Sequence, residues 1–460
     1  MKRAALHSLG CKVNSYETEA MRQMLEAEGY EIVPFHEKAD LYVINTCSVT
    51  NVADRKSRQM LHRARKQNPD AIIAAAGCYV QTSREQAGSD PAIDIIIGNN
   101  RKQDLAAIIR EFEESRARKP DESSVPDPEK NCASEQEESC TSESGKCLAK
   151  QAVFMSPDLN RPDPAYENLK VSHPAEHTRA FLKVQDGCNQ FCSYCIIPYA
   201  RGRVRSRQPE DVIRETRELA ANGYQEIVLT GIHLSSYGTD LGCALIDLIR
   251  ELHAVEGIRR IRLGSLEPGV ITESFVRELA GLNKVCPHFH LSLQSGSNTV
   301  LKRMNRRYTA EEYFDKCGLL RKYYEHPALT TDIIVGFPGE TREEFAETCA
   351  FVKRVSFYEI HVFKYSKRSR TAAARMDGQL TEQIKAERSR ELLKVSEEMK
   401  ERFVSWYEGR KVEVLFEEPV TVNGRNYYEG FTPEYVKTWI CTDESLRNRI
   451  KMVEFFRLIV

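Results

Sequence analysis

The chain has 460 residues and a formal net charge of −1, with 41% hydrophobic and 29% charged residues. This length predicts about three domains, and the near-zero charge means that any nucleic-acid-binding surface must be local. Its 14 cysteines are too few for a disulfide scaffold, and no apolar run is long enough for a membrane helix or a signal peptide. We therefore expect a cytoplasmic protein whose reduced thiols are core residues, reactive groups or metal ligands.

Residues 1–112 alternate short apolar runs with amphipathic segments, which predicts a doubly wound parallel α/β domain. The expected strands are Ala4–Leu6, Tyr42–Ile44, Ile72–Ala76 and Ile93–Ile97, and the expected helices are Ser15–Glu28, Asp54–Lys66 and Lys102–Phe112. Residues 113–176 are acidic and rich in serine and proline, a composition typical of a loosely ordered linker. We expect the linker cysteines Cys132, Cys140 and Cys147 to be solvated thiols.

Residues 177–403 show a second alternation of strands and helices, which predicts a partial (β/α)6 barrel followed by a connecting helix, Thr381–Phe403. The six expected strands are Ala180–Gln185, Glu226–Thr230, Arg260–Leu263, His288–Leu293, Thr331–Val335 and Glu359–Lys364. Residues 404–460 predict a small all-β barrel with Asn423-Gly424 as a hairpin turn. The chain is thus expected to be a multidomain α/β protein with an all-β C-terminus.

Three cysteines follow the first strand of the predicted barrel, where active sites collect. Cys188, Cys192 and Cys195 have the spacing Cys-x3-Cys-x2-Cys, so one loop can hold one metal centre. Zinc usually needs a fourth protein ligand, whereas a 4Fe-4S cluster with three cysteines leaves one iron open for a substrate or cofactor. This arrangement resembles the radical S-adenosylmethionine enzymes, in which the open iron binds S-adenosylmethionine.

Polar and glycine residues end the neighbouring barrel strands. We expect Tyr194, Gly231 and Gln294 to contact S-adenosylmethionine, although such glycines are equally typical of ordinary turns. Glu267, which ends the third strand, is either a pocket acid or a helix-capping acid.

A second set of cysteines, Cys11, Cys47 and Cys78, is dispersed in the sequence, but each directly follows a predicted strand. Because the carboxyl ends of parallel strands lie at one edge of a sheet, these thiols can converge there on a metal cluster. Buried structural cysteines are the alternative. Gly10 and Gly77 precede two of these cysteines and favour the cluster, since they leave space for a bulky inorganic group.

Several motifs together resemble the radical S-adenosylmethionine methylthiotransferases. They are Gly10-Cys11-Lys12-Val13-Asn14-Ser15-Tyr16-Glu17, Asn45-Thr46-Cys47-Ser48, Gly77-Cys78, Gly187-Cys188-Asn189-Gln190-Phe191-Cys192-Ser193-Tyr194-Cys195 and Arg201-Gly202-Arg203-Val204-Arg205. The resemblance implies two 4Fe-4S clusters, an auxiliary cluster on Cys11, Cys47 and Cys78 and a radical cluster on Cys188, Cys192 and Cys195, with S-adenosylmethionine as cofactor. It also implies that the C-terminal module is a TRAM RNA-binding domain.

Within this family, the motifs after Gly10 and Thr46 most resemble the branch that acts on N6-threonylcarbamoyladenosine at tRNA position 37. The resemblance therefore implies conversion of this nucleoside to its 2-methylthio derivative. Alternatives with the same chemistry are isopentenyladenosine in tRNA and an aspartate of a ribosomal protein. The alternative from another class is a non-catalytic iron–sulfur or zinc RNA-binding protein.

Local basic groups are the expected contacts to a tRNA anticodon stem-loop. Six arginines follow predicted strands and are expected RNA contacts, with solvated surface charge as the alternative: Arg201, Arg203, Arg205, Arg207, Arg306 and Arg307. Further expected partners are a flavodoxin- or ferredoxin-type electron donor and a sulfur source of unknown identity. We expect a monomer that does not associate with membranes.

Overall fold

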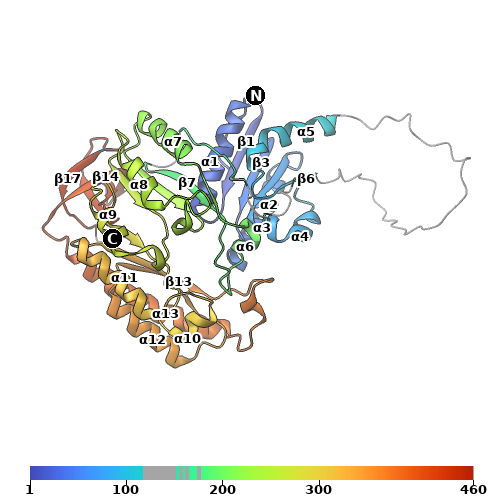
Figure 1. Cartoon of the computed structure of the whole chain (residues 1–460). Helices are drawn as coiled ribbons and strands as arrows, with labels where there is room; N and C mark the ends of the chain where they lie inside the picture. Colours follow the sequence, from blue (N-terminus) through green and yellow to red (C-terminus); the bar gives the residue numbers. More distant parts are fainter. Residues whose placement is uncertain (118–151, 155–158, 161–164, 174–177, 459–460) are drawn as a thin grey trace, which may run out of the picture.

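A computed structural model describes residues 1–117, 152–154, 159–160, 165–173 and 178–458 (Figure 1). The cysteines Cys132, Cys140 and Cys147 lie outside these residues. Among the described helices, none combines the length and apolar character required to cross a bilayer. The fold contains parallel α/β sheets and a C-terminal all-β sheet, as the sequence predicted.

The first sheet is parallel and six-stranded, with the order β2-β1-β3-β4-β5-β6. Its strands are β1 (Arg3–Ser8), β2 (Glu31–Ile32), β3 (Leu41–Thr46), β4 (Ile72–Gly77), β5 (Ile95–Ile97) and β6 (Ala152–Phe154). One face packs on α1 (Lys12–Ala27) and α5 (Leu105–Ala117). The other packs on α2 (Asn51–Gln67), α3 (Cys78–Thr82) and α4 (Arg84–Gly88). This domain is therefore doubly wound, with β1 and β3 on either side of its topological switch point.

Part of the predicted linker is folded, which corrects the expectation of loose order throughout residues 113–176. Helix α5 continues to Ala117, and β6 pairs in parallel with β5 at the sheet edge. Leu169 and Val171 are buried against α1. These short apolar stretches were masked by the acidic and serine-rich composition around them.

Six parallel strands of the central region follow one another in space. They are β7 (Ala180–Asp186), β9 (Glu226–Gly231), β10 (Arg260–Leu263), β11 (His288–His290), β12 (Ala328–Val335) and β13 (Glu359–Lys364). Hydrogen bonding defines two sheets, β10-β9-β7-β8 and β11-β12-β13, and the parallel bridges Ile261–Val285 and Leu266–Leu291 connect them. The short strand β8 (Arg205–Ser206) is antiparallel to β7.

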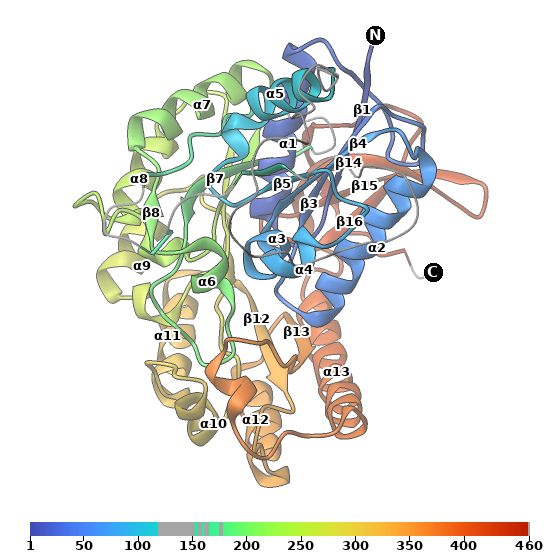
Figure 2. The same cartoon turned by 90° about the vertical axis from the view of Figure 1, so that its right-hand side faces the viewer.

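Helices cover the outer face of these strands, and their apolar side chains form the largest core cluster. They are α7 (Pro209–Ala221), α8 (Leu245–His253), α9 (Glu273–Ala280), α11 (Ala310–Tyr323) and α12 (Arg342–Val355), with α6 (Ile197–Arg201) and α10 (Asn298–Arg303) in the loops. Thr309 and Thr341 begin α11 and α12 with capping boxes to Glu312 and Glu344. The long helix α13 (Glu382–Ser405) then passes along β13 (Figure 2).

The C-terminal sheet is antiparallel, with the order β16-β15-β14-β17. Its strands are β14 (Lys411–Val422), β15 (Arg425–Phe431), β16 (Lys437–Cys441) and β17 (Ile450–Glu454). Asn423 and Gly424 both have positive φ, as the predicted hairpin turn requires. The sheet packs on residues that begin the central strands, for example Ala328 and Arg260. It therefore lies at the end of the central strands opposite the loops that carry the cysteines.

Candidate functional site

The three amino-terminal cysteines follow three adjacent strands of the first sheet, as predicted. Cys11 follows β1, Cys47 follows β3 and Cys78 begins α3 directly after β4. Cys11 is exposed, whereas the other two are buried. Gly10 has a φ of +103°, and a Cβ atom there would lie 2.7 Å from Cys47 Sγ. Glycine is thus needed both for the turn and for the space beside this thiol.

The spacing of these thiols fits a larger cluster better than a mononuclear zinc site. Among the described residues, one group of three His, Cys, Asp or Glu has all its ligand atoms within 4.8 Å of one another, and it contains none of the cysteines. Four thiolates around one zinc ion, with Zn–S bonds of about 2.3 Å, lie roughly 3.8 Å apart. In a 4Fe-4S cluster each thiolate binds a different iron, so the thiols stand further apart.

Burial at this site opposes ionisation of the thiols. Burial, together with the neighbouring Cys78 and Cys11 thiols, raises the pKa of Cys47 to about 12, and the charge of Arg201 acts in the opposite direction. A bound metal ion removes the protons from such thiols outright. The three thiols are therefore expected to become thiolates only when a cation such as cluster iron binds them.

The central cysteines lie on one loop between β7 and α6. This loop folds back on the segment that follows it, because Cys188 N donates to Gly202 O at 3.0 Å. Gly187 has positive φ, and a Cβ atom there would overlap Arg203 O. Within the loop, Cys195 N donates to Cys192 O at 3.0 Å, and Gln190 N donates to Cys188 Sγ at 3.5 Å. The backbone therefore curls around the thiols and directs an N–H group at one of them.

Burial is the main cause of the raised thiol pKa values in this loop. It raises the pKa of Cys188 to about 11 and, together with the neighbouring Cys192, that of Cys195 to about 12. Arg306 donates from Nη1 to Cys192 Sγ at 3.2 Å. This donor set also fits a cluster that carries negative charge on its thiolates.

The sequence did not reveal a polar group that lies beside this loop and centres on Glu267. Its carboxylate accepts hydrogen bonds from Gln190 Nε2 at 2.8 Å and His233 Nε2 at 3.1 Å and forms an ion pair with Arg306 at 3.3 Å. Burial opposes ionisation of Glu267, but the His233 hydrogen bond and the Arg306 charge outweigh it, so its pKa is lowered. Glu267 precedes the 3-10 helix Pro268–Val270, but its side chain makes no capping hydrogen bond, so the structure favours the pocket acid over the helix-capping acid.

Of the residues expected to contact S-adenosylmethionine, Tyr194 lies in this loop, and Gly231 and Gln294 lie at or just beyond the ends of β9 and β11. Tyr194 packs against Phe337, with its ring centroid 6.5 Å away. A Cβ atom on Gly231 would lie 2.9 Å from Gln185 Oε1, and Gln294 has a φ of +72°. Their contacts to the cofactor stay predictions.

The expectation of RNA contact is wrong for Arg201, Arg205 and Arg207. Their side chains are at most 2% exposed and pair with carboxylates rather than facing solvent. Arg207, for example, pairs with Glu215 at 2.6 Å. The sequence pattern gave no sign of these pairings, and one partner, Glu17, comes from a distant segment.

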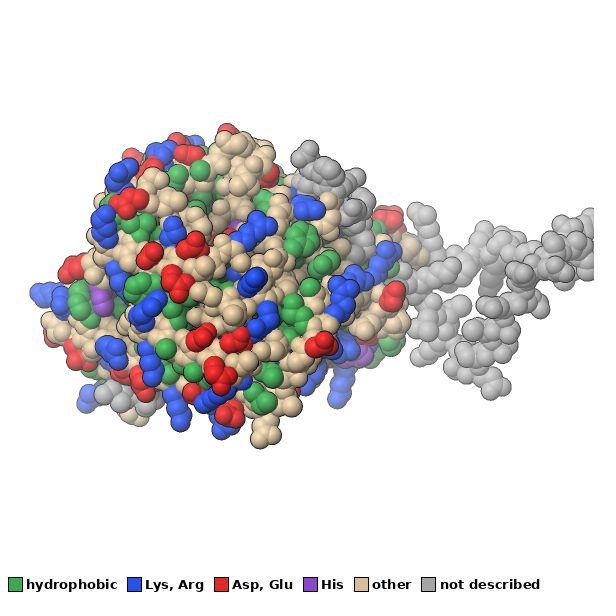
Figure 3. Space-filling view, turned by 60° about the horizontal axis from the view of Figure 1, so that its bottom comes forward, with side chains coloured by type: hydrophobic (Ala, Val, Ile, Leu, Met, Phe, Trp, Pro, Cys, Tyr) green, Lys and Arg blue, Asp and Glu red, His purple; other side chains and the backbone are tan. Residues whose placement is uncertain are grey.

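The other three arginines differ in their surroundings. Arg203 and Arg307 are exposed, so RNA contact stays a prediction for them. Arg306 lies largely buried against Cys192 and Glu267, which places it in the cluster environment rather than on the surface. Basic and acidic side chains are interspersed on the face shown in Figure 3, so this view offers no continuous positive surface.

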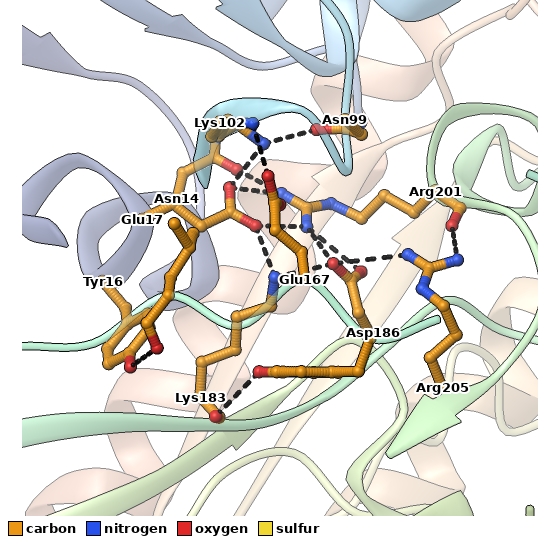
Figure 4. A network of polar contacts seen from close by, with 12 residues as sticks. Asn14, Tyr16, Glu17, Asn99, Lys102, Glu167, Lys183, Asp186, Arg201 and Arg205 are labelled. Atoms are coloured by element: carbon orange, nitrogen blue, oxygen red, sulfur yellow. Dashed lines mark hydrogen bonds and ion pairs between the residues drawn. The ribbon is translucent and has the colours of Figure 1, made fainter. Parts of the chain in front are cut away.

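A buried polar network joins the two cysteine sites (Figure 4). Glu17 of α1 pairs with Lys183 of β7 at 2.7 Å and with Arg201 of α6 at 2.8 Å. Asp186, two residues before Cys188, also pairs with Lys183 and Arg201, at 2.7 and 3.0 Å. The network thus fixes the first domain against the strand and helix that flank the central cysteine loop.

Asn14 and Asn99 extend this network to the amino-terminal thiols. Asn14 donates to Thr46 O and accepts from Arg201 Nη2 at 2.6 Å. Asn99 Nδ2 lies 3.6 Å from Cys78 Sγ and 2.8 Å from Ala200 O. The edges of the two domains that carry the cysteines therefore contact each other.

The network contains more positive than negative charge. Four cations, Lys102, Lys183, Arg201 and Arg205, lie among three carboxylates, Glu17, Asp186 and Glu167, the last of which accepts from the backbone N–H groups of Lys102 and Gln103. The buried atoms Arg201 Nε and Arg205 Nε have no hydrogen-bond acceptor. The excess of positive charge fits anionic thiolates at the adjacent site.

Comparisons with known proteins agree with this geometry. Residues 182–352 match the radical SAM superfamily, and residues 3–98 match the family described as uncharacterized protein family UPF0004. The chain is 41% identical to the threonylcarbamoyladenosine tRNA methylthiotransferase MtaB of Bacillus subtilis, covering 99% of this chain and 94% of that protein. It is 36% identical to the tRNA-2-methylthio-N(6)-dimethylallyladenosine synthase of Moorella thermoacetica, covering 97% and 94%.

A solved structure has the same fold over much of the chain. The radical S-adenosylmethionine methyltransferase TsrM of Kitasatospora setae aligns with a TM-score of 0.54 and 15% identity, covering 79% of this chain and 73% of that one. Identity to the full-length relatives, together with two cysteine triplets on contacting strand edges, identifies the protein class. The chain belongs to the radical S-adenosylmethionine methylthiotransferases, whose cofactors are S-adenosylmethionine and 4Fe-4S clusters.

Proposed function

We propose that the chain converts N6-threonylcarbamoyladenosine at position 37 of tRNA to its 2-methylthio derivative. The observation that carries this proposal is the pair of three-cysteine sites, each at strand ends and each on an edge that contacts the other domain. The 41% identity to the MtaB protein of Bacillus subtilis supports this nucleoside as the substrate.

Cys11, Cys47 and Cys78 would hold the auxiliary 4Fe-4S cluster, and Cys188, Cys192 and Cys195 the radical cluster. When bound, these clusters and S-adenosylmethionine supply one-electron cleavage and the methylthio group. The target carbon carries no acidic proton, so a general base in the site would have nothing to remove, and homolytic chemistry is required.

The protein side chains position these groups and exclude water. Arg306 and the N–H group of Gln190 donate to thiols of the central loop. Glu267 receives donors from Gln190, His233 and Arg306, which fixes the loop against the end of β10. Glu17, Asp186 and Arg201 would keep the two clusters at a constant separation, because all three are buried at the domain contact.

The domain assignment is part of the proposal. Residues 1–112 would form the auxiliary-cluster domain, residues 177–403 a partial (β/α)6 barrel with its connecting helix, and residues 404–460 a TRAM-type module. The spatial sequence of six parallel strands supports the barrel. We further propose a cytoplasmic monomer that binds the anticodon stem-loop, with Arg203 and Arg307 among its contacts, and receives electrons from a flavodoxin or ferredoxin.

The second candidate substrate is N6-dimethylallyladenosine, because the Moorella thermoacetica relative named for it is 36% identical over nearly the whole chain. Mass spectrometry of tRNA nucleosides from a strain lacking the gene distinguishes the two. We expect 2-methylthio-threonylcarbamoyladenosine to disappear while the dimethylallyl derivative persists. Retention of the threonylcarbamoyl derivative would reject the proposed substrate.

A further inference from the structure

Three neighbouring strands of the central region bring two histidines and an aspartate together. His290 ends β11, Asp332 lies in β12 and His361 lies in β13. Their ligand atoms all lie within 4.8 Å of one another, and no other group of three such residues among the described parts of the chain meets this limit. None of the three belongs to the cysteine sites.

The strand register explains why these side chains meet. His290 is paired with Thr330, and Asp332 is paired with His361. Because side chains alternate along a strand, Thr330 and Asp332 are on the same face of β12. The three ligating residues therefore share one face of a parallel sheet, where hydrogen bonding between the strands holds their backbones rigidly.

The geometry of His290 is that of a metal-ligating imidazole. Its Nδ1 atom is hydrogen-bonded to Thr330 Oγ1 at 3.0 Å, while Nε2 lies 3.2 Å from Asp332 Oδ2. Nε2 is buried and makes no hydrogen bond of good geometry. The His361 ring stacks on His290, with centroids 5.7 Å apart. In metal sites, one ring nitrogen of a ligating histidine is typically hydrogen-bonded to a protein group, which leaves the other ring nitrogen for the metal ion.

This group is closed on one side and open on the other. The side chain of His290 is 12% exposed and that of Asp332 28% exposed, whereas His361 is exposed. Two histidines and one carboxylate fill three coordination positions of a transition metal ion and leave its other coordination positions open. A ligand can therefore approach from the His361 side.

The chain that carries His290 continues toward the central cysteine loop. Ser292, two residues beyond His290, accepts a hydrogen bond from Arg306, which also donates to Cys192 Sγ. Two residues along an extended chain span about 7 Å. His290 therefore lies about 7 Å before Ser292 along the chain, and Ser292 contacts the arginine that binds the central cysteine loop.

We propose that His290, Asp332 and His361 bind a divalent transition metal ion whose open positions take an oxygen donor of the substrate. This proposal rests on the proposed function in one respect: the threonylcarbamoyl group carries a carboxylate and a hydroxyl, whereas a dimethylallyl group has no oxygen to offer. The metal site would then select for the modified nucleoside. The alternative is that His290 and Asp332 form an ion pair without any metal ion.

Zinc binding to the reconstituted holoenzyme tests the metal site without any tRNA. After anaerobic equilibrium dialysis against Zn²⁺, zinc and iron are counted in the same sample, so that displacement of cluster iron is detected. We expect one zinc per chain with unchanged iron. His361→Ala and Asp332→Asn should weaken zinc binding at least tenfold. Thr330→Val removes the hydrogen-bond partner of His290 Nδ1 and should weaken zinc binding roughly 10- to 100-fold.

His62→Ala provides a matched control, because His62 and Asp90 form a comparable pair at 3.1 Å on the surface without a third ligand in the described structure. Its zinc binding should equal that of the unchanged protein. Equal zinc uptake by the unchanged protein and His361→Ala, or an equal loss in His62→Ala, would overturn the metal site. Methylthiolation that persists in that case would leave the proposed function standing.

Anticodon stem-loops test the oxygen ligand. A stem-loop with threonylcarbamoyladenosine should tighten zinc binding relative to the same stem-loop with unmodified adenosine, and this difference should disappear in His361→Ala. Identical zinc affinities with both stem-loops would overturn the assignment of the substrate oxygen as ligand.

Discussion

Removal of the Glu17 charge tests whether the buried network holds the two cluster domains together. The Glu17 carboxylate lies 2.9 Å from Lys102 Nζ, 2.7 Å from Lys183 Nζ and 2.8 Å from Arg201 Nη1, and the side chains of all four residues are fully buried. Glu17→Gln leaves Lys183 and Arg201 paired with Asp186 and removes the ion pair of Lys102. Breaking a buried ion pair in this way costs about 3–5 kcal/mol.

This free energy should be measured as local opening, since a multidomain chain does not unfold in one step. Hydrogen exchange monitored by mass spectrometry reports α1 and β7 separately from the C-terminal sheet. At about 1.4 kcal/mol per factor of ten, we expect exchange of α1 and β7 to rise roughly 100- to 4,000-fold. The C-terminal sheet should exchange unchanged.

Glu26→Gln is the control, because Glu26 is on the same helix and pairs with Arg22 at a partly exposed position. Such pairs contribute about 0.2–0.5 kcal/mol, so protection should change by less than about threefold. If Glu17→Gln and Glu26→Gln gave the same exchange rates, the account of the network as the domain clamp would be refuted.

The remaining predictions concern pH and the cysteine sites. The pKa of Glu17 is held well below its ordinary value of 4.5, because the charges of Arg201, Lys102 and Lys183 outweigh the effect of burial. The ionised Glu17 carboxylate therefore contributes its full stabilisation above pH 4.5, and this stabilisation is lost as the pH falls through the folded-state pKa. Protection of α1 should thus fall in acid but not between pH 6 and 8, and loss of protection in that neutral range would contradict the assignment. Cys192→Ala should abolish reductive cleavage of S-adenosylmethionine, measured as 5′-deoxyadenosine; normal cleavage would exclude Cys192 as a radical-cluster ligand. Cys47→Ala should retain cleavage while methylthiolation of the stem-loop disappears, and loss of both activities would argue against separate cluster roles. Gly10→Ala should lower the iron content of the auxiliary site, because its Cβ atom would lie 2.7 Å from Cys47 Sγ; a full complement of iron would show that the turn can adapt.

The positions of the six cysteines could be predicted because each depends on a local pattern. Cys11, Cys47 and Cys78 each follow an apolar run that forms a buried strand, and strand ends of a parallel sheet necessarily share an edge. The central loop was visible from spacing alone. These predictions needed no knowledge of long-range pairing.

The environment of Arg201 could not be predicted, because its partner Glu17 is 184 residues away in sequence. Alternating arginines are typical of a solvent-exposed basic face. Docking of the first domain places Glu17 opposite Arg201, while β7 and α7 of the central region supply Asp186 and Glu215. The contact of His233 with Glu267 likewise depends on the register between neighbouring strands. Such pairings arise from tertiary packing, which local patterns do not encode.

Three of the arginines expected to contact RNA, Arg201, Arg205 and Arg207, pair with the buried carboxylates Glu17, Asp186 and Glu215. The surface available for tRNA is therefore smaller than the arginine pattern suggested.

Iron content after anaerobic reconstitution tests the central claim, that two separate three-cysteine sites each hold a cluster. We expect about eight irons per chain, and about four after all three cysteines of either site are changed to alanine. Cleavage of S-adenosylmethionine should persist only in the variant that retains Cys188, Cys192 and Cys195. Zinc in place of iron, or about four irons that are lost entirely with one set of cysteines, would contradict the account.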